Sequence, residues 1–416
     1  MQQIPFAGVS STSKVPLVHP FKSMEREEYT IMKCRNLRNS SLAMFGLASL
    51  LIYVLACTSF SPDDKKVLYT ALDPASGLVG ISVYDRQTEK SELLFVPSMV
   101  EDGGESTLPV MVRAQWMHNG KDVLVSWASP KNSDDSLHLA VVPFLHKGPT
   151  RIYMIAAKEA ASRLMLPLAV SGSHLFFPAK TNRLARLDLD TGLMSYNDGW
   201  DDDSCVLPTR SGRDILYFTT TEMGIMNPRT FERSKQVTIP ESEQQGEQQV
   251  LVSIDGGQYG YLTTNGPTLV LNLFESGKPV RVLPLQATLK ETEKLGLLTY
   301  SMSQKRLYAP YIDRPKDDKS SILGFLEIPL DGSPPIRTVL FETKAEFDKE
   351  DTTFFFQPSI SNDGKTLAVS TTYLSGKKGA NPKDCALYFI DLSSPKRTIK
   401  RVAIPQGPRN LLSDLF

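Results

Sequence analysis

The chain has 416 residues, and its 46 lysines and arginines balance 46 aspartates and glutamates. A neutral chain lacks the basic face that nucleic-acid binding requires, so the composition argues against a nucleic-acid partner. Five histidines occur without a ligand spacing such as H-x-x-x-H, and we therefore expect no zinc site.

Residues 1–31 are polar, carry no apolar period and are longer than the basic region of an ordinary signal peptide. We interpret them as an N-terminal extension that results from a start codon assigned too early. Met32 is then the expected first residue of the protein.

Residues 32–56 have the pattern of a signal peptide. Lys33, Arg35 and Arg38 form a basic region without acidic residues, and the apolar run 42–56 follows. Fifteen helical residues cover roughly 22 Å, less than the ~30 Å hydrocarbon core of a bilayer. The run therefore fits the apolar region of a signal peptide better than a membrane span.

The end of this run, Val54-Leu55-Ala56-Cys57, resembles the lipobox of bacterial lipoproteins, in which apolar and small residues precede a cysteine. The resemblance implies cleavage after Ala56 and attachment of diacylglycerol and a further acyl chain, such as palmitate, to Cys57. The next residue is Thr58 rather than Asp, which implies the outer membrane of the bacterial cell envelope. The alternative is a signal anchor that keeps residues 42–56 in the membrane and leaves Cys57 unmodified.

Seven later stretches share one pattern: a strand, a tight turn rich in Asn, Asp and Gly, and a second strand with alternating apolar residues. The clearest is SISNDGKTLAVST at 359–371. The others are 60–71, 115–127, 169–179, 208–220, 252–264 and 300–311. We predict two-residue hairpins with positive φ, which Gly, Asn and Asp adopt most easily. The positions that correspond to Gly364 are Asp64, Gly120, Gly172, Gly212, Gly257 and Gln304.

These turns resemble the S-P-D-G-K signature of TolB-type and WD-repeat-like propeller blades. Each repeat continues with a third strand, a turn and a fourth strand, and the clearest of these outer hairpins are 80–97, 185–197, 269–285 and 386–405. The resemblance implies an all-β chain in which residues 57–416 form a single β-propeller. Repeats spaced 40 to 60 residues apart fit seven four-stranded blades, with six or eight as alternatives. Only 156–165 has a helical pattern.

The two ends of the propeller region are predicted to complete one blade. Only residues 58–60 lie between Cys57 and the first turn, so the first repeat is expected to lack an inner strand. Residues 408–416 follow a complete seventh repeat. We predict that they supply the missing strand and close the ring, which leaves no exposed sheet edge. The alternative is a free C-terminal tail.

Two cysteines, Cys205 and Cys385, remain in the propeller region. They could form a disulfide in an exported protein, but the sequence does not bring their Cα atoms within bonding range. We favour two free, half-buried thiols.

Charged loops are expected to gather on one face, because inter-blade linkers and the loops between second and third strands lie together in propellers. Loops on rigid scaffolds often carry binding residues. Our candidate binding residues on this face are Asp198, Asp201, Asp202, Asp203, Arg314, Lys316, Lys377 and Lys378. The alternative is a set of solvated linkers and loops whose length costs little. The acidic run 197–205 does not match the calcium-loop spacing, and we expect neither a metal nor a cofactor.

Two functions follow as hypotheses. The first is a lipid-anchored, non-enzymatic scaffold that binds a protein or polymer partner on the loop face. The second is an enzyme that acts on a glycan or lactone. Its carboxylates at the channel mouth would be those of Asp201, Asp202 and Asp203 with Asp102 or Glu105, and they would have to lie about 5–10 Å apart. No G-x-S-x-G nucleophile motif is present.

Overall fold

The structure is a computed structural model in which the chain divides into two compact units, Met1–Lys33 and Cys34–Phe416. All described residues belong to the second unit. They are 56–72, 79–97, 100–102, 105–107, 110–128, 137–145, 148–155, 168–200, 204–209, 213–219, 221–240, 248–252, 258–265, 268–275, 278–284, 290, 292–295, 299–301, 304–314, 320–331, 333–344, 356–372 and 382–404.

The strands of the described residues form seven sheets of four or five strands each, together with one small hairpin. The first sheet contains β1 (Ala56–Phe60), β2 (Lys66–Leu72), β3 (Val79–Asp85), β4 (Lys90–Phe95) and β28 (Phe356–Gln357). The second contains β7 (Val110–Trp116), β8 (Asp122–Ala128), β9 (Leu137–Pro143) and β10 (Arg151–Ile155). The third contains β11 (Ala169–Ser171), β12 (His174–Ala179), β13 (Arg183–Asp188) and β14 (Met194–Asp198).

The fourth sheet contains β15 (Cys205–Pro208), β16 (Ile215–Phe218), β17 (Glu222–Met226) and β18 (Arg233–Thr238). The fifth contains β19 (Gln248–Val252), β20 (Gln258–Asn265), β21 (Thr268–Glu275) and β22 (Lys278–Pro284). The sixth contains β23 (Glu293–Leu295), β24 (Thr299–Ser301), β25 (Arg306–Asp313), β26 (Ser321–Pro329) and β27 (Ile336–Thr343). The seventh contains β29 (Ser359–Ile360), β30 (Thr366–Ser370), β31 (Ala386–Asp391) and β32 (Ile399–Ala403).

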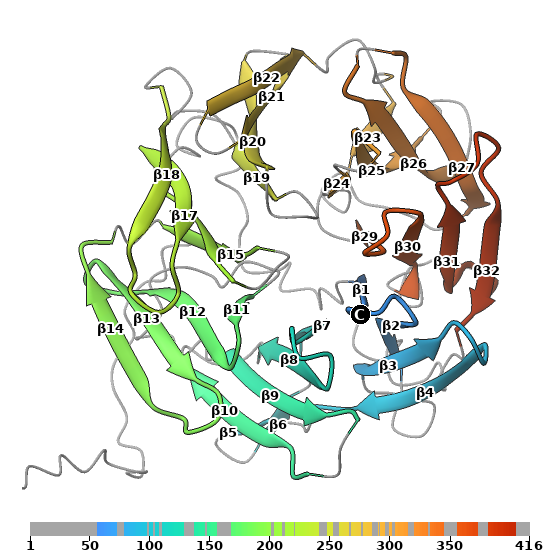
Figure 1. The fold of residues 1–416 in the computed structure, drawn as a ribbon. Coiled ribbons are helices and arrows are strands. Elements are labelled where there is room, and N and C mark those ends of the chain that lie inside the picture. The colour runs from blue at the N-terminus through green and yellow to red at the C-terminus, as the bar shows by residue number, and fades with distance from the viewer. Residues whose placement is uncertain are drawn as a thin grey trace, which may run out of the picture. The chain divides into compact units, whose positions relative to one another are not determined.

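Within this unit, Figure 1 shows the sheets following one another in chain order around a common centre. The first-to-second, second-to-third and third-to-fourth strands of each sheet pair antiparallel. The chain is therefore an all-β protein with the architecture of a β-propeller, as the sequence predicted. We call the sheets blades 1 to 7.

The seven sequence repeats supply the first two strands of the seven blades, and the four outer hairpins are the third and fourth strands of blades 1, 3, 5 and 7. In blade 6 the inner strand is interrupted: β23 and β24 both pair with β25, one after the other.

The hairpin turns of blades 1, 2 and 7 are longer than predicted. In blade 1, the Ser61 N–H donates to the Lys66 carbonyl at 2.9 Å, so four residues lie between the paired ends, and the Asp64 N–H donates to the Ser61 carbonyl at 2.9 Å. The turns 117–122 and 361–366 repeat both bonds. The prediction of two-residue hairpins is therefore wrong for blades 1, 2 and 7, which have four-residue loops built around a β-turn. It is confirmed in blade 3, where Ser171 pairs with His174 and only two residues lie between them.

A left-handed residue occurs at the predicted position in the turns of blades 1, 2, 3 and 7. Asp64, Gly120, Gly172 and Gly364 have φ between 59° and 73°. In blade 6 the left-handed residue is Lys305, with φ of 50°, one position after the predicted Gln304. Gly212 and Gly257 lie outside the described residues.

The first blade does have an inner strand, contrary to the sequence prediction. In β1, Thr58, Ser59 and Phe60 lie opposite Tyr69, Leu68 and Val67 of β2. On its other side, β1 pairs in parallel with β28, which directly precedes blade 7. This pairing joins the two ends of the blade series through residues about 300 positions apart. Residues 408–416, predicted to close the ring, lie outside the described residues.

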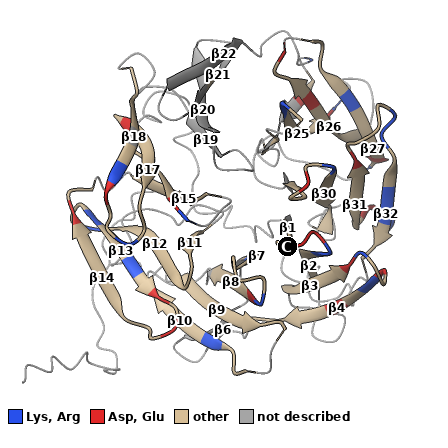
Figure 2. Cartoon of the chain, in the orientation of Figure 1, with Lys and Arg blue, Asp and Glu red and all other residues tan. Residues whose placement is uncertain are grey.

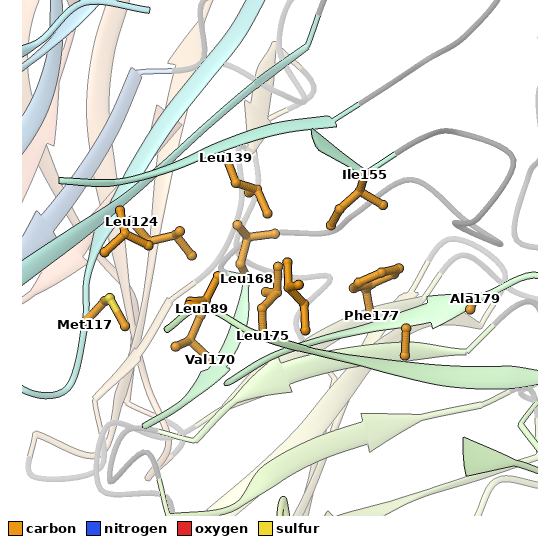
Figure 3. Close-up of a cluster of buried hydrophobic side chains, with 13 residues drawn as sticks. Met117, Leu124, Leu139, Ile155, Leu168, Val170, Leu175, Phe177, Ala179 and Leu189 are labelled. Carbon is orange, nitrogen blue, oxygen red and sulfur yellow. The ribbon is translucent and has the colours of Figure 1, made fainter. Parts of the chain in front are cut away.

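Apolar clusters fill the interfaces between neighbouring blades. One cluster joins blades 2 and 3, and Figure 3 shows Leu124 and Leu139 of blade 2 facing Leu175 and Phe177 of blade 3. Other clusters join blades 1 and 2, 3 and 4, 6 and 7, and 7 and 1. The alternation of apolar residues along each strand produces these two-sided cores, because successive side chains point to opposite faces of a sheet.

Cys205 and Cys385 are free thiols, as favoured from the sequence; Cys205 is half-buried, whereas Cys385 is fully buried. The predicted helical segment 156–165 lies outside the described residues. Among those residues, no helix has the length and apolar character needed to cross a bilayer.

Candidate functional site

The predicted lipidation residue, Cys57, lies in the first strand of the first blade. Its Cα is opposite that of Gln357 in the parallel β1–β28 pair, and Ala56 is opposite Phe356. Val54 and Leu55 of the predicted cleavage motif lie outside the described residues. The backbone thus passes from the predicted cleavage point into the blade without an intervening linker.

We define the linker face as the side of the propeller on which first and third strands begin and second and fourth strands end. The opposite side, the turn face, carries the four-residue turns. Of the predicted binding residues, Asp198 ends β14 and is exposed, and Arg314 follows β25 and is half-buried. Both lie on the linker face, but in different blades. The other predicted binding residues lie outside the described residues: Asp201, Asp202, Asp203, Lys316, Lys377 and Lys378.

Beside Arg314, blade 6 contains a charged cluster that the sequence analysis missed. Glu293 begins β23 and lies opposite Asp313, the last residue of β25. Arg337 donates to both carboxylate oxygens of Glu293, at 2.6 and 2.8 Å. The Lys290 Nζ donates to Asp313 at 2.7 Å and lies 3.6 Å from Glu293. We call Lys290, Glu293, Asp313 and Arg337 the blade-6 cluster.

Both carboxylates of the blade-6 cluster are buried, with side chains 1% and 6% exposed. Burial by itself raises the pKa of Glu293, but the Arg337 guanidinium and the Lys290 N–H hold that pKa below its ordinary value. Burial likewise raises the pKa of Asp313, and hydrogen bonds from Lys290 and from Thr292 at 2.6 Å lower it overall. Both groups are therefore ionised at neutral pH, because each is paired with a cation.

This arrangement does not suit hydrolysis by a carboxylate pair. Such a reaction needs one carboxylic acid with a raised pKa to protonate the leaving group. In the blade-6 cluster both pKa values are lowered and both carboxylates are occupied by donors. The cluster instead holds two buried carboxylates and their cations at the linker face. The Lys290 side chain is 56% exposed there.

The carboxylates proposed for an enzyme are placed only in part. Asp102 and Glu105 are opposite residues in the two-stranded β5–β6 hairpin (Val100–Asp102 and Glu105–Thr107). Their predicted partners, Asp201 to Asp203, lie outside the described residues. Among the residues that the structure describes, no group of His, Cys, Asp or Glu side chains is arranged to hold a metal ion.

A sequence signal for part of the blade-6 cluster exists. Lys290-Glu291-Thr292-Glu293 directly precedes an inner strand, and Asp313-Arg314 directly follows the second strand of the same repeat. Strand pairing brings these two positions to one end of the blade. Arg337 has no such signal, because it reaches Glu293 from the fourth strand.

Comparisons with known proteins found similarity to solved structures only, at low sequence identity. A scan against models of known protein families and a search of curated proteins both found no match. Solved structures similar to this chain include TolB from Acinetobacter baumannii, with 12% sequence identity over 66% of each chain and a TM-score of 0.38. At this identity the similarity is one of fold alone.

Two further solved structures cover different shares of the chain. The β-propeller domain of Cps50 (Swd1) from Myceliophteria thermophila has 16% identity, covers 61% of this chain and 77% of its own, and has a TM-score of 0.39. Oligogalacturonate lyase in complex with manganese has 11% identity, covers 85% of this chain and 89% of its own, and has a TM-score of 0.46.

Proposed function

We propose that this protein is a bacterial lipoprotein whose propeller is held at the cell envelope, in the outer membrane, by acyl chains on Cys57. The propeller acts as a non-enzymatic scaffold for a protein or polymer partner. The predicted signal peptide, residues 32–56, directs export and is removed, together with any translated part of residues 1–31.

The observation that carries this proposal is the position of the predicted cleavage point relative to the described pairs of β1. Cleavage before Cys57 would leave the antiparallel partners of β2, Thr58 to Phe60, in place. Of the described β1 pairs, cleavage would remove only the one between Ala56 and Phe356. The chain that precedes Cys57 is therefore dispensable for the antiparallel pairs of blade 1, as expected of a segment that is cut away.

The blade-6 cluster does not suit hydrolysis, because its buried carboxylates, Glu293 and Asp313, are both ionised and bound by cations. The non-enzymatic role of the whole propeller is proposed from the sequence. A glycan- or lactone-cleaving function based on Asp102 or Glu105 remains a hypothesis of the sequence. Steady-state assays of the purified chain with glycans and lactones distinguish the two functions, and turnover that is lost in Asp102→Asn or Glu105→Gln would contradict the scaffold proposal.

Lipidation is tested with Cys57→Ser, since only a thiol accepts the diacylglycerol. The wild-type protein should incorporate labelled palmitate, partition into detergent and begin at residue 57. Cys57→Ser should carry no label. The matched control is Cys205→Ser, which removes a half-buried thiol in β15 and should be labelled like the wild type. A wild-type protein that lacks label and retains residues 42–56 would instead be a signal anchor.

The scaffold function is tested by cross-linking in intact cells that express a tagged wild-type chain, followed by purification from envelopes. A partner should be recovered in near-stoichiometric yield from the wild type. Cys57→Ser should recover much less, because it is not brought to the membrane where the partner resides. If neither the wild type nor Cys57→Ser yields a partner, the scaffold function is contradicted.

A further inference from the structure

No flexible linker separates Cys57, the proposed site of acylation, from the first strand of the propeller. Thr58, the residue after Cys57, is 6% exposed, and its hydroxyl donates to the Ala368 carbonyl at 3.1 Å and accepts a hydrogen bond from Ser359 at 3.1 Å. Adjacent Cα atoms are about 3.8 Å apart. An acyl chain on Cys57 would therefore be attached one residue from a buried, doubly hydrogen-bonded position.

The strand register fixes the side of the propeller from which this attachment leaves. β1 runs antiparallel to β2, with Thr58 opposite Tyr69 and Phe60 opposite Val67. Cys57 consequently lies at the end of the blade where β2 finishes and β3 begins, because Leu72 is opposite Val79. This end belongs to the linker face.

Exposed lysines lie on the linker face of the two blades that precede blade 1 in the ring. Lys290 precedes β23, Lys344 follows β27, and Lys383 precedes β31. Blade 6 packs on blade 7, and blade 7 packs on blade 1. These side chains share the linker face with Cys57 and with the exposed Asp198, and a basic residue on that face is attracted to anionic headgroups.

We infer that the linker face lies flush against the bilayer, with Lys344 and Lys383 at the phospholipid headgroups and the turn face directed away from the membrane. This inference rests on the proposed lipidation of Cys57 and adds an orientation to it. A chain with a flexible tether would sample many orientations, whereas an anchor at the first strand of a folded blade allows few.

This orientation also changes the face on which we expect the partner to bind. The linker face, on which the sequence analysis placed its candidate binding residues, becomes the lipid-contacting surface. The turn face remains open to the periplasm. Figure 2 shows acidic and basic positions side by side in the turns before β2 and β30, which lie on that face in blades 1 and 7.

The orientation is tested by photo-cross-linking of the full lipidated protein in vesicles of phosphatidylethanolamine and phosphatidylglycerol. p-Benzoylphenylalanine replaces one exposed lysine at a time: Lys344 or Lys383 on the linker face, and, as matched controls, Lys121 or Lys365 in the four-residue turns. Lipid adducts should form at least fivefold more at the linker-face positions. Equal yields on both faces, or higher yields at Lys121 and Lys365, would overturn the orientation.

A spacer variant tests the cause of the orientation. Insertion of twenty Gly and Ser residues between Cys57 and Thr58 provides a flexible tether of about 25 Å r.m.s. length. The adduct yield at Lys344 should fall at least threefold, and an unchanged yield would overturn the flush attachment. Labelled palmitate is counted in every sample. Samples without label contradict lipidation and the orientation with it, whereas labelled samples with equal yields on both faces contradict the orientation alone.

Discussion

The interface between blades 2 and 3 differs in kind from the interface between blades 7 and 1. The first contains a cluster of thirteen buried apolar residues, and polar contacts such as those of Gln115 with the Leu168 backbone and of Arg151 with Asp190 also cross it. The second has a smaller apolar cluster and many directional hydrogen bonds. Asp64 of blade 1, for example, accepts from the Asn362 N–H at 2.5 Å, the Asn362 side chain at 2.8 Å and the Asp363 N–H at 2.9 Å.

The difference follows from the position of each interface along the chain. Blades 2 and 3 are joined by a short stretch of backbone, so apolar burial suffices to pack them. Blades 7 and 1 bring together residues about 300 positions apart, and closing so long a loop has a larger entropic cost. Apolar contact is non-directional. The hydrogen bonds at the 7–1 interface, including the Thr372 hydroxyl to the Thr70 carbonyl at 2.7 Å, specify which blades meet.

The largest effect is expected where apolar burial dominates. Phe177→Ala removes a side chain that is 0% exposed at the centre of the 2–3 interface. The free energy of unfolding should fall by about 3–5 kcal/mol, measured by urea denaturation. Leu193→Ala is the control, because Leu193 is 65% exposed and its removal should change stability by less than about 0.5 kcal/mol. A loss below about 1 kcal/mol for Phe177→Ala would contradict the packing described for this interface.

A smaller effect is expected at the 7–1 interface. Asp64→Ala removes three hydrogen bonds and should lower the free energy of unfolding by about 1–2 kcal/mol, since these groups are partly solvated. A double-mutant cycle with Asn362→Ala should give a coupling energy of about 0.5–1.5 kcal/mol. Additive effects of the two substitutions would show that the two turns do not interact in solution.

Arg86 offers a sharper probe of the same interface. Its guanidinium donates to the Asp64 carbonyl at 2.7 Å and to the Thr366 hydroxyl at 3.1 Å, and it lies 5.4 Å from the ring centroid of Phe60. Arg86→Lys keeps the positive charge but loses the planar guanidinium and its several N–H donors. We expect the free energy of unfolding to fall by about 1 kcal/mol. Hydrogen exchange should then increase in β1 and β30 and stay unchanged in β12. A uniform increase would mean that the 7–1 interface does not open separately.

The smallest effect is the pH dependence contributed by Asp363, whose N–H donates to Asp64 across the 7–1 interface. Burial by itself raises the pKa of Asp363, but hydrogen bonds from the Ser361 hydroxyl at 2.6 Å and the Lys365 N–H at 2.9 Å lower it below the ordinary value of 3.8. The folded-state pKa is thus below the unfolded one. This carboxylate therefore stabilises the fold above about pH 4, and the contribution is lost as the pH falls through the lower folded-state value.

Asp363→Asn tests this dependence. Unfolding midpoints in urea at pH 6 and pH 3 should fall less on acidification for the variant than for the wild type, because the variant has no carboxylate to protonate at this position. Equal falls would contradict a lowered pKa for Asp363. Leu193→Ala, which removes no ionisable group and an exposed side chain, is the control and should follow the wild type.

Much of the fold could be predicted because its signals are local. Each repeat carries its own turn residues and its own apolar alternation, so the positions of the strands and of left-handed residues such as Gly120 and Gly364 follow from short stretches of sequence. The turn length could not be predicted in the same way. It depends on the backbone bond from Ser61 to Lys66, which the turn sequence does not distinguish from a shorter loop.

The sequence by itself determined the all-β blades, because hydrophobic periodicity and turn chemistry are properties of adjacent residues. The pattern that predicts a boundary at Cys57 is equally local. Tertiary structure alone decided how blade 7 meets blade 1, which strand accompanies β1, and that Arg337 reaches Glu293. These contacts join residues separated by tens to hundreds of positions, and their formation depends on geometry that exists only once the blades have packed. The direction in which the proposed anchor at Cys57 would leave the propeller belongs to the same class, since it would be set by the register of β1 against β2.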